Sequence, residues 1–177
     1  YKNSVATRPT SDHVDFLGSK VIGYGIDEKT FESLMHEVIA FYRQQGKSLR
    51  YITHRSEPLD YLEKVALKLG FELVNLSNII EVAYAQADAL PSEIATFRTA
   101  AVSNLHTIFD LPVRIFEMPQ ERLESSTREN LKIIYKNFRE QGFTIEQPLC
   151  AEDKIAGPDT HKTTATTQAG PASSTHK

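Results

Sequence analysis

Apolar side chains recur along this chain with two different periods, one typical of helices and one typical of strands. The clearest helical pattern covers residues 28–45, where apolar positions return every three or four residues, with Asp27 as the expected N-cap and Gly46 after the helix. Pro58 opens a second helix of the same kind, which Gly70 ends. The apolar face of the first helix consists of Phe31, Leu34, Met35, Val38, Ile39 and Tyr42.

Short apolar runs lie between the helical segments and predict strands. The expected strands cover residues 21–26 (VIGYGI), 48–53 (SLRYIT), 71–75 (FELVN), 94–97 and 113–116 (VRIF). Residues 79–87 are predicted as a short helix or an irregular edge segment. A further helix is expected after Thr99, with Val102, Leu105, Ile108 and Phe109 on its inner face, and a last helix over residues 120–141.

Strands that alternate with helices at this spacing predict right-handed βαβ crossovers and a mostly parallel sheet covered on both faces. We therefore expect an α/β fold, a Rossmann-like parallel sheet flanked by helices, over residues 20–150. Residues 1–19 mix polar residues with Pro9 and Gly18 and are interpreted as a linker or the remnant of a preceding domain. Residues 151–177 consist mainly of Thr, Ala, Ser, Gly and Pro and are predicted to be a disordered tail.

Composition narrows the class of protein. With 177 residues and 40% hydrophobic content the chain can bury one core, and a net charge of -3 with mixed signs gives no general reason to expect nucleic acid as a partner. Cys150 is the only cysteine, which excludes an intrachain disulfide and a Cys-rich metal site. No window approaches the roughly 20 apolar residues of a membrane span. The start at Tyr1, without a methionine, suggests a fragment or a processed chain.

Several chemically active side chains fall where the predicted strands end. Gly23 follows the first strand, His54 and Arg55 the second, Glu81 the third and Thr99 the fourth. In an open parallel sheet, ligands bind outside the carboxyl ends of the strands, so these residues are expected to share one edge. Gly23-Tyr-Gly25 lacks the third glycine of the dinucleotide fingerprint, so NAD is only weakly indicated.

Each of these residues has a functional and a purely structural interpretation. His54 and Arg55 suit a phosphate, although His54 can instead satisfy a backbone carbonyl while Arg55 pairs with Glu57 in solvent. Glu81 can accept from ribose hydroxyls or a base edge, or can simply face solvent. Thr99 begins a helix whose N-terminus attracts anions, or only caps that helix. The histidines at positions 13, 36 and 106 are isolated in sequence, so no metal site is predicted.

The same ordered segments resemble a known family. VIGYGIDEKTF, GKSLRYITHRSEP and LGFELVNLSNIIEVAYAQADALPSEIATFRTAAVSNLHTIF are similar to the C-terminal half of bacterial sialyltransferases with a GT-B fold, especially the lipooligosaccharide sialyltransferase and capsular polysialyltransferase group. The resemblance covers about residues 20–118. It implies the C-terminal, donor-binding domain of a GT-B glycosyltransferase, so residues 20–150 are expected to bind a nucleotide sugar.

The resemblance also assigns roles. The family histidine that contacts the donor phosphate matches His54, which becomes the expected catalytic residue, and the family's hydroxyl pair matches Thr99 and Ala100. The acidic residue near the cytidine or ribose matches Glu81. The expected donor-binding residues are Gly23, His54, Arg55, Glu81, Thr99 and Ala100. The sequence departs from the family where Ala100 lacks the second hydroxyl, Tyr24-Gly25 replaces Gln-Pro and Thr53 replaces a common proline.

Two hypotheses about function follow. In the first, the chain is the donor-binding part of a glycosyltransferase that moves sialic acid from CMP-sialic acid to a cell-surface glycan of lipooligosaccharide or capsule. No metal or other cofactor is then expected, the general base belongs to an N-terminal GT-B domain that this chain does not match, and the chain alone is expected to be inactive. The expected location is the cytoplasm, with the full-length enzyme peripheral to the inner membrane. In the second, the chain is a non-catalytic Rossmann-like nucleotide or polysaccharide-pathway binding module.

Overall fold

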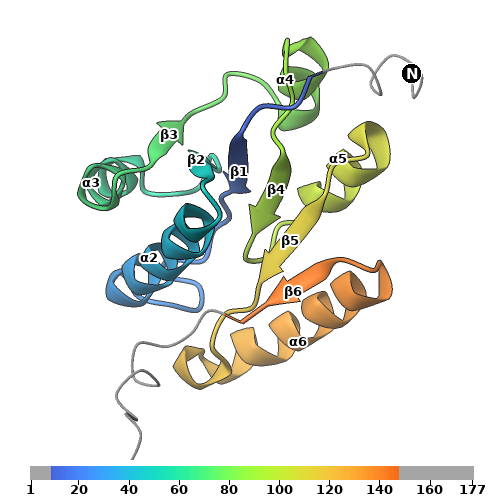
Figure 1. The fold of residues 1–177 in the computed structure, drawn as a ribbon. Helices are drawn as coiled ribbons and strands as arrows, with labels where there is room; N and C mark the ends of the chain where they lie inside the picture. The colour runs from blue at the N-terminus through green and yellow to red at the C-terminus, as the bar shows by residue number, and fades with distance from the viewer. Residues whose placement is uncertain (1–8, 148–177) are drawn as a thin grey trace, which may run out of the picture.

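The computed structural model describes residues 9–147, so the predicted disordered tail at 151–177 lies outside the described residues. These residues form a six-stranded parallel sheet in the order β3-β2-β1-β4-β5-β6, flanked by helices (Figure 1). The strands are β1 (His13–Leu17), β2 (Ser48–Ile52), β3 (Glu72–Val74), β4 (Glu93–Thr96), β5 (Val113–Phe116) and β6 (Thr144–Glu146). The predicted Rossmann-like α/β fold is confirmed.

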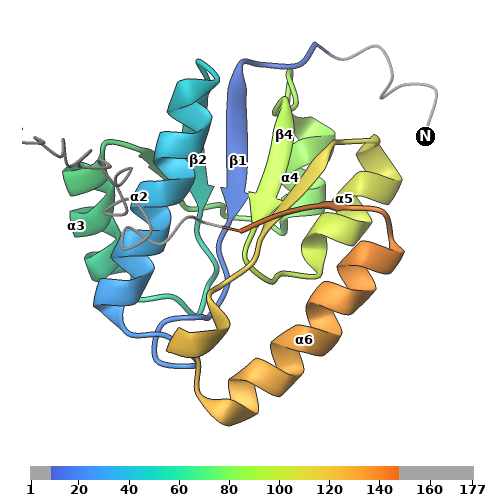
Figure 2. The ribbon, with the colours of Figure 1, turned by 60° about the horizontal axis from the view of Figure 1, so that its bottom comes forward.

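The helices cover both faces of the sheet. They are α2 (Glu28–Gln44), α3 (Leu59–Leu69), α4 (Ile80–Gln86), α5 (Ala101–Phe109) and α6 (Ser125–Glu140), preceded by the short 3-10 turn η1 (Gln120–Arg122). In Figure 2, α2 and α3 lie in front of the sheet and α4 and α5 behind it, while α6 runs beside the β6 end. The strand order reverses between β1 and β4, where the chain leaves one half of the sheet and starts the other.

The apolar periodicity located most elements within a few residues. The N-cap of α2 is Asp27, whose carboxylate accepts from the Thr30 N–H at 2.7 Å, and all six residues of its predicted apolar face are buried. The segment 79–87, predicted as either a helix or an irregular edge, forms α4. On α5, Ile108 is 41% exposed rather than packed inward, and the edge strand β6 was not predicted.

The prediction of the first strand was wrong. Residues 21–26 form a turn, in which the Gly23 N–H donates to the Ile26 carbonyl at 2.9 Å. The first strand is instead β1, inside the segment predicted to be a linker, and it lies between β2 and β4 at the centre of the sheet. The HVDFL sequence of β1 hides this position because a charged residue, Asp15, interrupts its apolar run.

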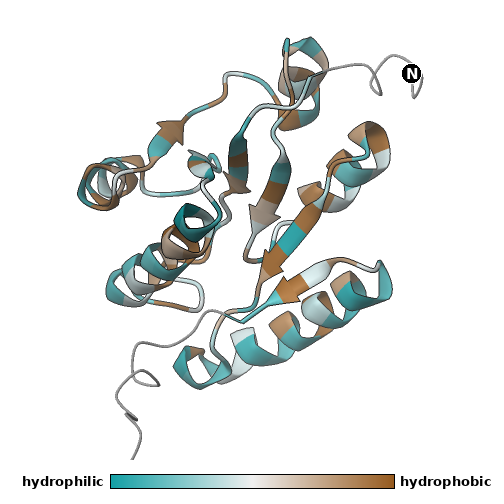
Figure 3. Cartoon of the chain, in the orientation of Figure 1, coloured by the Kyte–Doolittle hydropathy of each residue, from teal (hydrophilic) through white to brown (hydrophobic). Residues whose placement is uncertain are grey.

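Aromatic side chains form the centre of the core. Phe16 of β1 packs in an edge-on arrangement against Phe97, with ring centroids 4.8 Å apart, and stacks on Tyr51 at 5.5 Å. All three side chains are buried. Figure 3 shows that apolar residues predominate along the strands, whereas α6 is largely hydrophilic on the side facing the viewer. This distribution is the one expected of a sheet that is covered on both faces.

Asp15 is fully buried in the middle of the sheet and is neutralised by residues on neighbouring elements. Arg50, its direct partner in the register of β1 and β2, makes a two-pronged contact with the Asp15 carboxylate at 2.8 and 2.9 Å. The Tyr84 hydroxyl of α4 donates to the same carboxylate at 2.6 Å. Burial raises the pKa of Tyr84 and the Asp15 charge adds to this, so Tyr84 stays a donor. The buried charge is therefore paired and hydrogen-bonded.

We expect the substitution Arg50→Met to lower the free energy of unfolding by about 3 kcal/mol, because it leaves the Asp15 carboxylate buried without a counter-charge. Urea unfolding should show that the double variant Asp15→Asn/Arg50→Met recovers much of this loss. Lys132→Met is the control, since it removes only an exposed partner of Glu129 and should change stability by less than about 1 kcal/mol. A double variant less stable than Arg50→Met alone would contradict the expectation.

Candidate functional site

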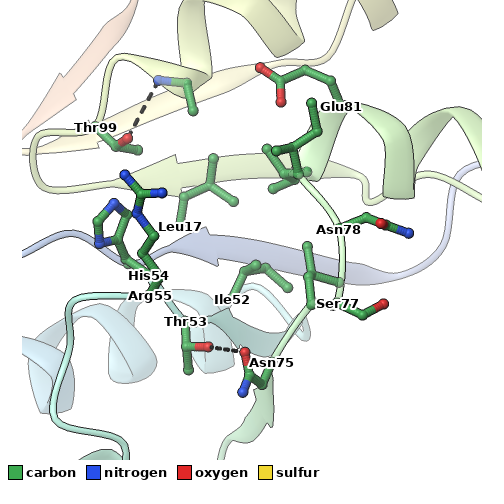
Figure 4. A pocket seen from close by; sticks show the side chains of 15 residues that line it. Leu17, Ile52, Thr53, His54, Arg55, Asn75, Ser77, Asn78, Glu81 and Thr99 are labelled. Carbon is green, nitrogen blue, oxygen red and sulfur yellow. Dashed lines mark hydrogen bonds between the residues drawn. The ribbon is translucent and has the colours of Figure 1, made fainter.

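A cavity of about 450 Å³ opens at the carboxyl ends of four neighbouring strands, β3, β2, β1 and β4. It therefore spans the point at which the strand order reverses, where open parallel sheets usually bind their ligands. Figure 4 shows His54 and Arg55 on one side of the cavity and Glu81 on the other. The lining residues are Leu17, Gly18, Ile52, Thr53, His54, Arg55, Asn75, Leu76, Ser77, Asn78, Ile79, Ile80, Glu81, Thr99 and Ala101.

The structure brings four of the six predicted site residues together, namely His54, Arg55, Glu81 and Thr99. The other two lie outside the cavity lining. Gly23 is an exposed residue of the turn before α2, and the glycine that follows the first strand into the cavity is Gly18. Ala100 is also exposed, and the cavity is lined instead by the next residue, Ala101.

Two hydrogen bonds hold His54, one to its imidazole ring and one from its backbone N–H. The backbone N–H of Ser56 donates to the His54 Nδ1 at 3.2 Å, and the His54 N–H donates to the Glu57 carboxylate at 2.7 Å. A neutral histidine whose Nδ1 accepts a hydrogen bond carries its proton on Nε2. His54 therefore presents an Nε2–H donor. The structural alternative was a hydrogen bond from the His54 ring to a backbone carbonyl. Among residues 9–147 the ring instead accepts from the Ser56 N–H.

The turn from β4 into α5 depends on two threonines. The buried Thr96 hydroxyl donates to the Leu17 carbonyl at 2.9 Å and accepts from the N–H groups of Arg98 and Thr99 at 3.2 and 3.3 Å. Thr99 Oγ1 accepts from the Ala101 N–H at 3.4 Å, so Thr99 helps to cap the helix. Its hydroxyl proton is left to donate, and Thr99 also lines the cavity. The structural and functional interpretations of Thr99 are thus compatible.

The charged residues of the cavity differ in how they are held. Glu81, in the first turn of α4, is half-buried and accepts from the Asn104 amide at 3.2 Å. Arg55 is exposed, and in Figure 4 its guanidinium extends toward Thr99. Within residues 9–147, Arg55 forms no salt bridge with Glu57, which was the structural alternative for this arginine.

Glu57 lies outside the cavity lining, and the sequence suggested it only as a surface partner for Arg55. Its carboxylate accepts from the Tyr51 hydroxyl at 2.6 Å and from the His54 N–H at 2.7 Å, and the Ser19 N–H adds a weaker interaction. Burial raises the pKa of the Glu57 carboxyl above its usual value, and the three hydrogen bonds oppose this rise. Burial also raises the pKa of Tyr51, and the Glu57 charge adds to the effect.

Sequence reasoning also missed the polar residues after β3. The Thr53 hydroxyl lies 3.3 Å from the Asn75 Oδ1, so the Asn75 amide NH₂ remains available as a donor at the cavity (Figure 4). Ser77 and Asn78 follow in the same loop. Their position just past a short apolar strand is the signal that could have identified them, because the ends of parallel strands meet at one edge.

Comparisons with known proteins add little to this geometry. No protein-family model matches the chain, and no curated protein sequence matches it. One structurally similar chain is S. aureus MnaA in a co-structure with UDP, with 15% sequence identity and a TM-score of 0.41. The match covers 78% of this chain, and this chain spans only 38% of that one. At this TM-score the likeness carries no argument about function.

Among residues 9–147, no group of three or more His, Cys, Asp or Glu side chains is placed to hold a metal ion. None of the helices in this part of the chain combines the length and the hydropathy that crossing a bilayer requires.

Gly18→Ala is expected to lower the free energy of unfolding by about 1–3 kcal/mol, because the new methyl group would lie 2.2 Å from the Glu57 Oε2 and 2.8 Å from the Tyr51 Cε1. Thermal and urea unfolding would measure the loss. The same substitution should be less harmful in a Glu57→Ala background, where the closest clashing atom is gone. Equal losses in both backgrounds would show that Glu57 does not set the space around Gly18.

We expect the Glu57 carboxyl to titrate above 4.5, its usual pKa. Because the folded chain then binds this proton more tightly than the unfolded chain, the contribution of Glu57 to stability is complete below about pH 4.5 and is lost as pH rises through the folded pKa. Carboxyl ¹³C chemical shifts, assigned by comparison with Glu57→Gln, would give the midpoint. A midpoint below 4.5 would mean that the three hydrogen bonds outweigh burial.

Proposed function

We propose that the cavity binds the nucleotide of a sugar-nucleotide donor, and that the chain is the donor-binding part of a glycosyltransferase that uses CMP-sialic acid. One observation carries the proposal: residues that suit a phosphate and residues that suit a ribose or base lie in one cavity at the strand-order reversal. The cytidine base and the sialic acid rest on the sequence resemblance alone. The acceptor would be a cell-surface glycan.

The side with His54 and Arg55 suits the phosphate. The Nε2–H of His54 and the guanidinium of Arg55 are both donors, and Arg55 brings a permanent positive charge. Thr99 adds a hydroxyl at the start of α5, where the helix dipole is positive. A phosphate that accumulates negative charge as the glycosidic bond breaks is stabilised by donors already in place. His54 is therefore the residue proposed to act on the departing phosphate.

The opposite side suits the nucleoside. Glu81 is an acceptor that two vicinal hydroxyls of a ribose could share, and Asn104 holds its carboxylate from behind. Asn75 offers amide donors from the end of β3. Leu17, Ile52 and Leu76 supply apolar surface between these polar groups. A small number of placed polar groups in a partly apolar cavity is typical of nucleotide and cofactor sites.

The proposal predicts that CMP binds more tightly than cytidine and that the difference depends on His54 and Thr99. One lost hydrogen bond to a charged oxygen costs about 1.5–3 kcal/mol, so His54→Ala and Thr99→Val should each weaken CMP binding about ten-fold or more. Cytidine binding should change much less. Titration calorimetry with CMP, cytidine and UMP would measure these affinities.

Two matched controls separate the site from general damage. His36→Ala removes an exposed histidine of α2, and Thr107→Val removes a hydroxyl from the exposed side of α5, where it donates to the Ser103 carbonyl at 2.8 Å. Both should leave CMP affinity unchanged. Equal wild-type affinities for CMP and cytidine would reject the phosphate site, and tighter binding of UMP than CMP would reject the cytidine donor.

A further inference from the structure

One half-buried carboxylate, Glu57, contacts both loops that line the cavity after β1 and after β2. Glu57 Oε2 accepts from the His54 N–H in the loop after β2 at 2.7 Å, and the Ser19 N–H in the loop after β1 adds a weaker interaction with the same carboxylate. Its other oxygen accepts from the Tyr51 hydroxyl at the end of β2. Three donors from separate points along the chain therefore converge on a single side chain.

The packing around Glu57 leaves these loops little freedom. A Cβ on Gly18 would lie 2.2 Å from the Glu57 Oε2, so the Gly18 backbone rests directly against the carboxylate. The Glu57 N–H also donates to the His54 carbonyl at 2.9 Å, which closes a tight turn around the histidine. Gly18 and His54 both line the cavity, whereas Glu57 does not.

We propose that Glu57 is a positioning residue for the nucleotide cavity, which sets the place of His54 relative to the loop after β1 without itself touching the ligand. The proposal rests on the proposed function for the identity of the ligand. Its physical basis is independent of that identity: a carboxylate oxygen has lone pairs for more than one donor, and a single acceptor shared by two loops fixes the distance between them. With that acceptor removed, the His54 Nε2–H would no longer face a defined position.

A purely structural role for Glu57 would predict a different result. Glu93 provides the comparison, because its buried carboxylate accepts from a tyrosine hydroxyl, as that of Glu57 does, and also from an arginine. The Tyr42 hydroxyl donates to Glu93, and Arg114 contacts it at 2.8 and 3.2 Å. None of these three residues lines the cavity. Substituting Glu93 should therefore reduce stability without changing the cavity.

The test compares Glu57→Gln, Glu57→Asp and Glu93→Gln in the whole chain. Amide ¹H–¹⁵N spectra should show the His54 and Ser19 signals moving upfield in both Glu57 variants. Glu57→Gln removes the negative charge of the acceptor, and Glu57→Asp moves the carboxylate away from both amides. CMP affinity, measured by calorimetry at a temperature where every variant is folded, should fall about ten-fold in Glu57→Gln. Cytidine affinity should change less than two-fold, since cytidine lacks the phosphate that His54 meets.

The outcomes distinguish the two proposals. Glu93→Gln should lower the melting temperature and leave CMP affinity and the His54 amide unchanged. Unchanged His54 and Ser19 amide signals in the Glu57 variants, or CMP affinities that follow melting temperature equally in all three variants, would overturn the positioning role. If the wild type binds neither CMP nor UMP, the proposed function fails, while the amide signals still decide whether Glu57 holds the loops. Should Glu57→Gln not fold, Glu57→Asp keeps the charge and tests the same geometry.

Discussion

The buried carboxylate of Asp15, in the middle of the sheet, constrains the elements that contact it, β2 and α4. Removing a charge from water is expensive unless partners replace the hydration, and Asp15 has no exposed surface. Arg50 provides the counter-charge and thereby holds β2 beside β1, while Tyr84 brings α4 against the sheet. Since α4 also carries Glu81, the hydrogen bond between Tyr84 and Asp15 helps to hold one wall of the cavity against the sheet.

The fold could be predicted from sequence wherever burial shows as periodicity. The inner face of α2 is apolar at every third or fourth position, so its limits and its N-cap were correctly identified. β1 was missed for a physical reason: the counter-charge of its central Asp15 comes from Arg50 and a hydrogen bond from Tyr84, which are 35 and 69 residues away. The nearby His13, whose Nε2 lies 3.4 Å from the Asp15 carboxylate, does not reveal these partners. The segment 21–26 has a more continuous apolar run than β1 and was therefore predicted as the first strand, but it forms a turn.

The candidate site could be predicted only in part. His54, Arg55, Glu81 and Thr99 follow strands whose ends were placed correctly, and parallel pairing then brings them to one edge. Gly23 lies outside the cavity lining, because it was predicted to follow a first strand that is in fact a turn. Glu57 was out of reach for another reason, since its role depends on the convergence of Tyr51, His54 and Ser19, which only the packed loops reveal.

The strand order also has a consequence for how the chain reaches its native state. Neighbouring strands in the described sheet are all parallel, so each pairing closes a loop through a helix, and the Thr96 hydroxyl meets the Leu17 carbonyl across 79 residues. Non-local pairing of this kind slows folding. During synthesis β1 leaves the ribosome long before β4 and has an open edge in the meantime. Because acidic side chains on an open edge disfavour pairing with another chain, we expect Asp15 to limit aggregation of β1 before β4 joins it.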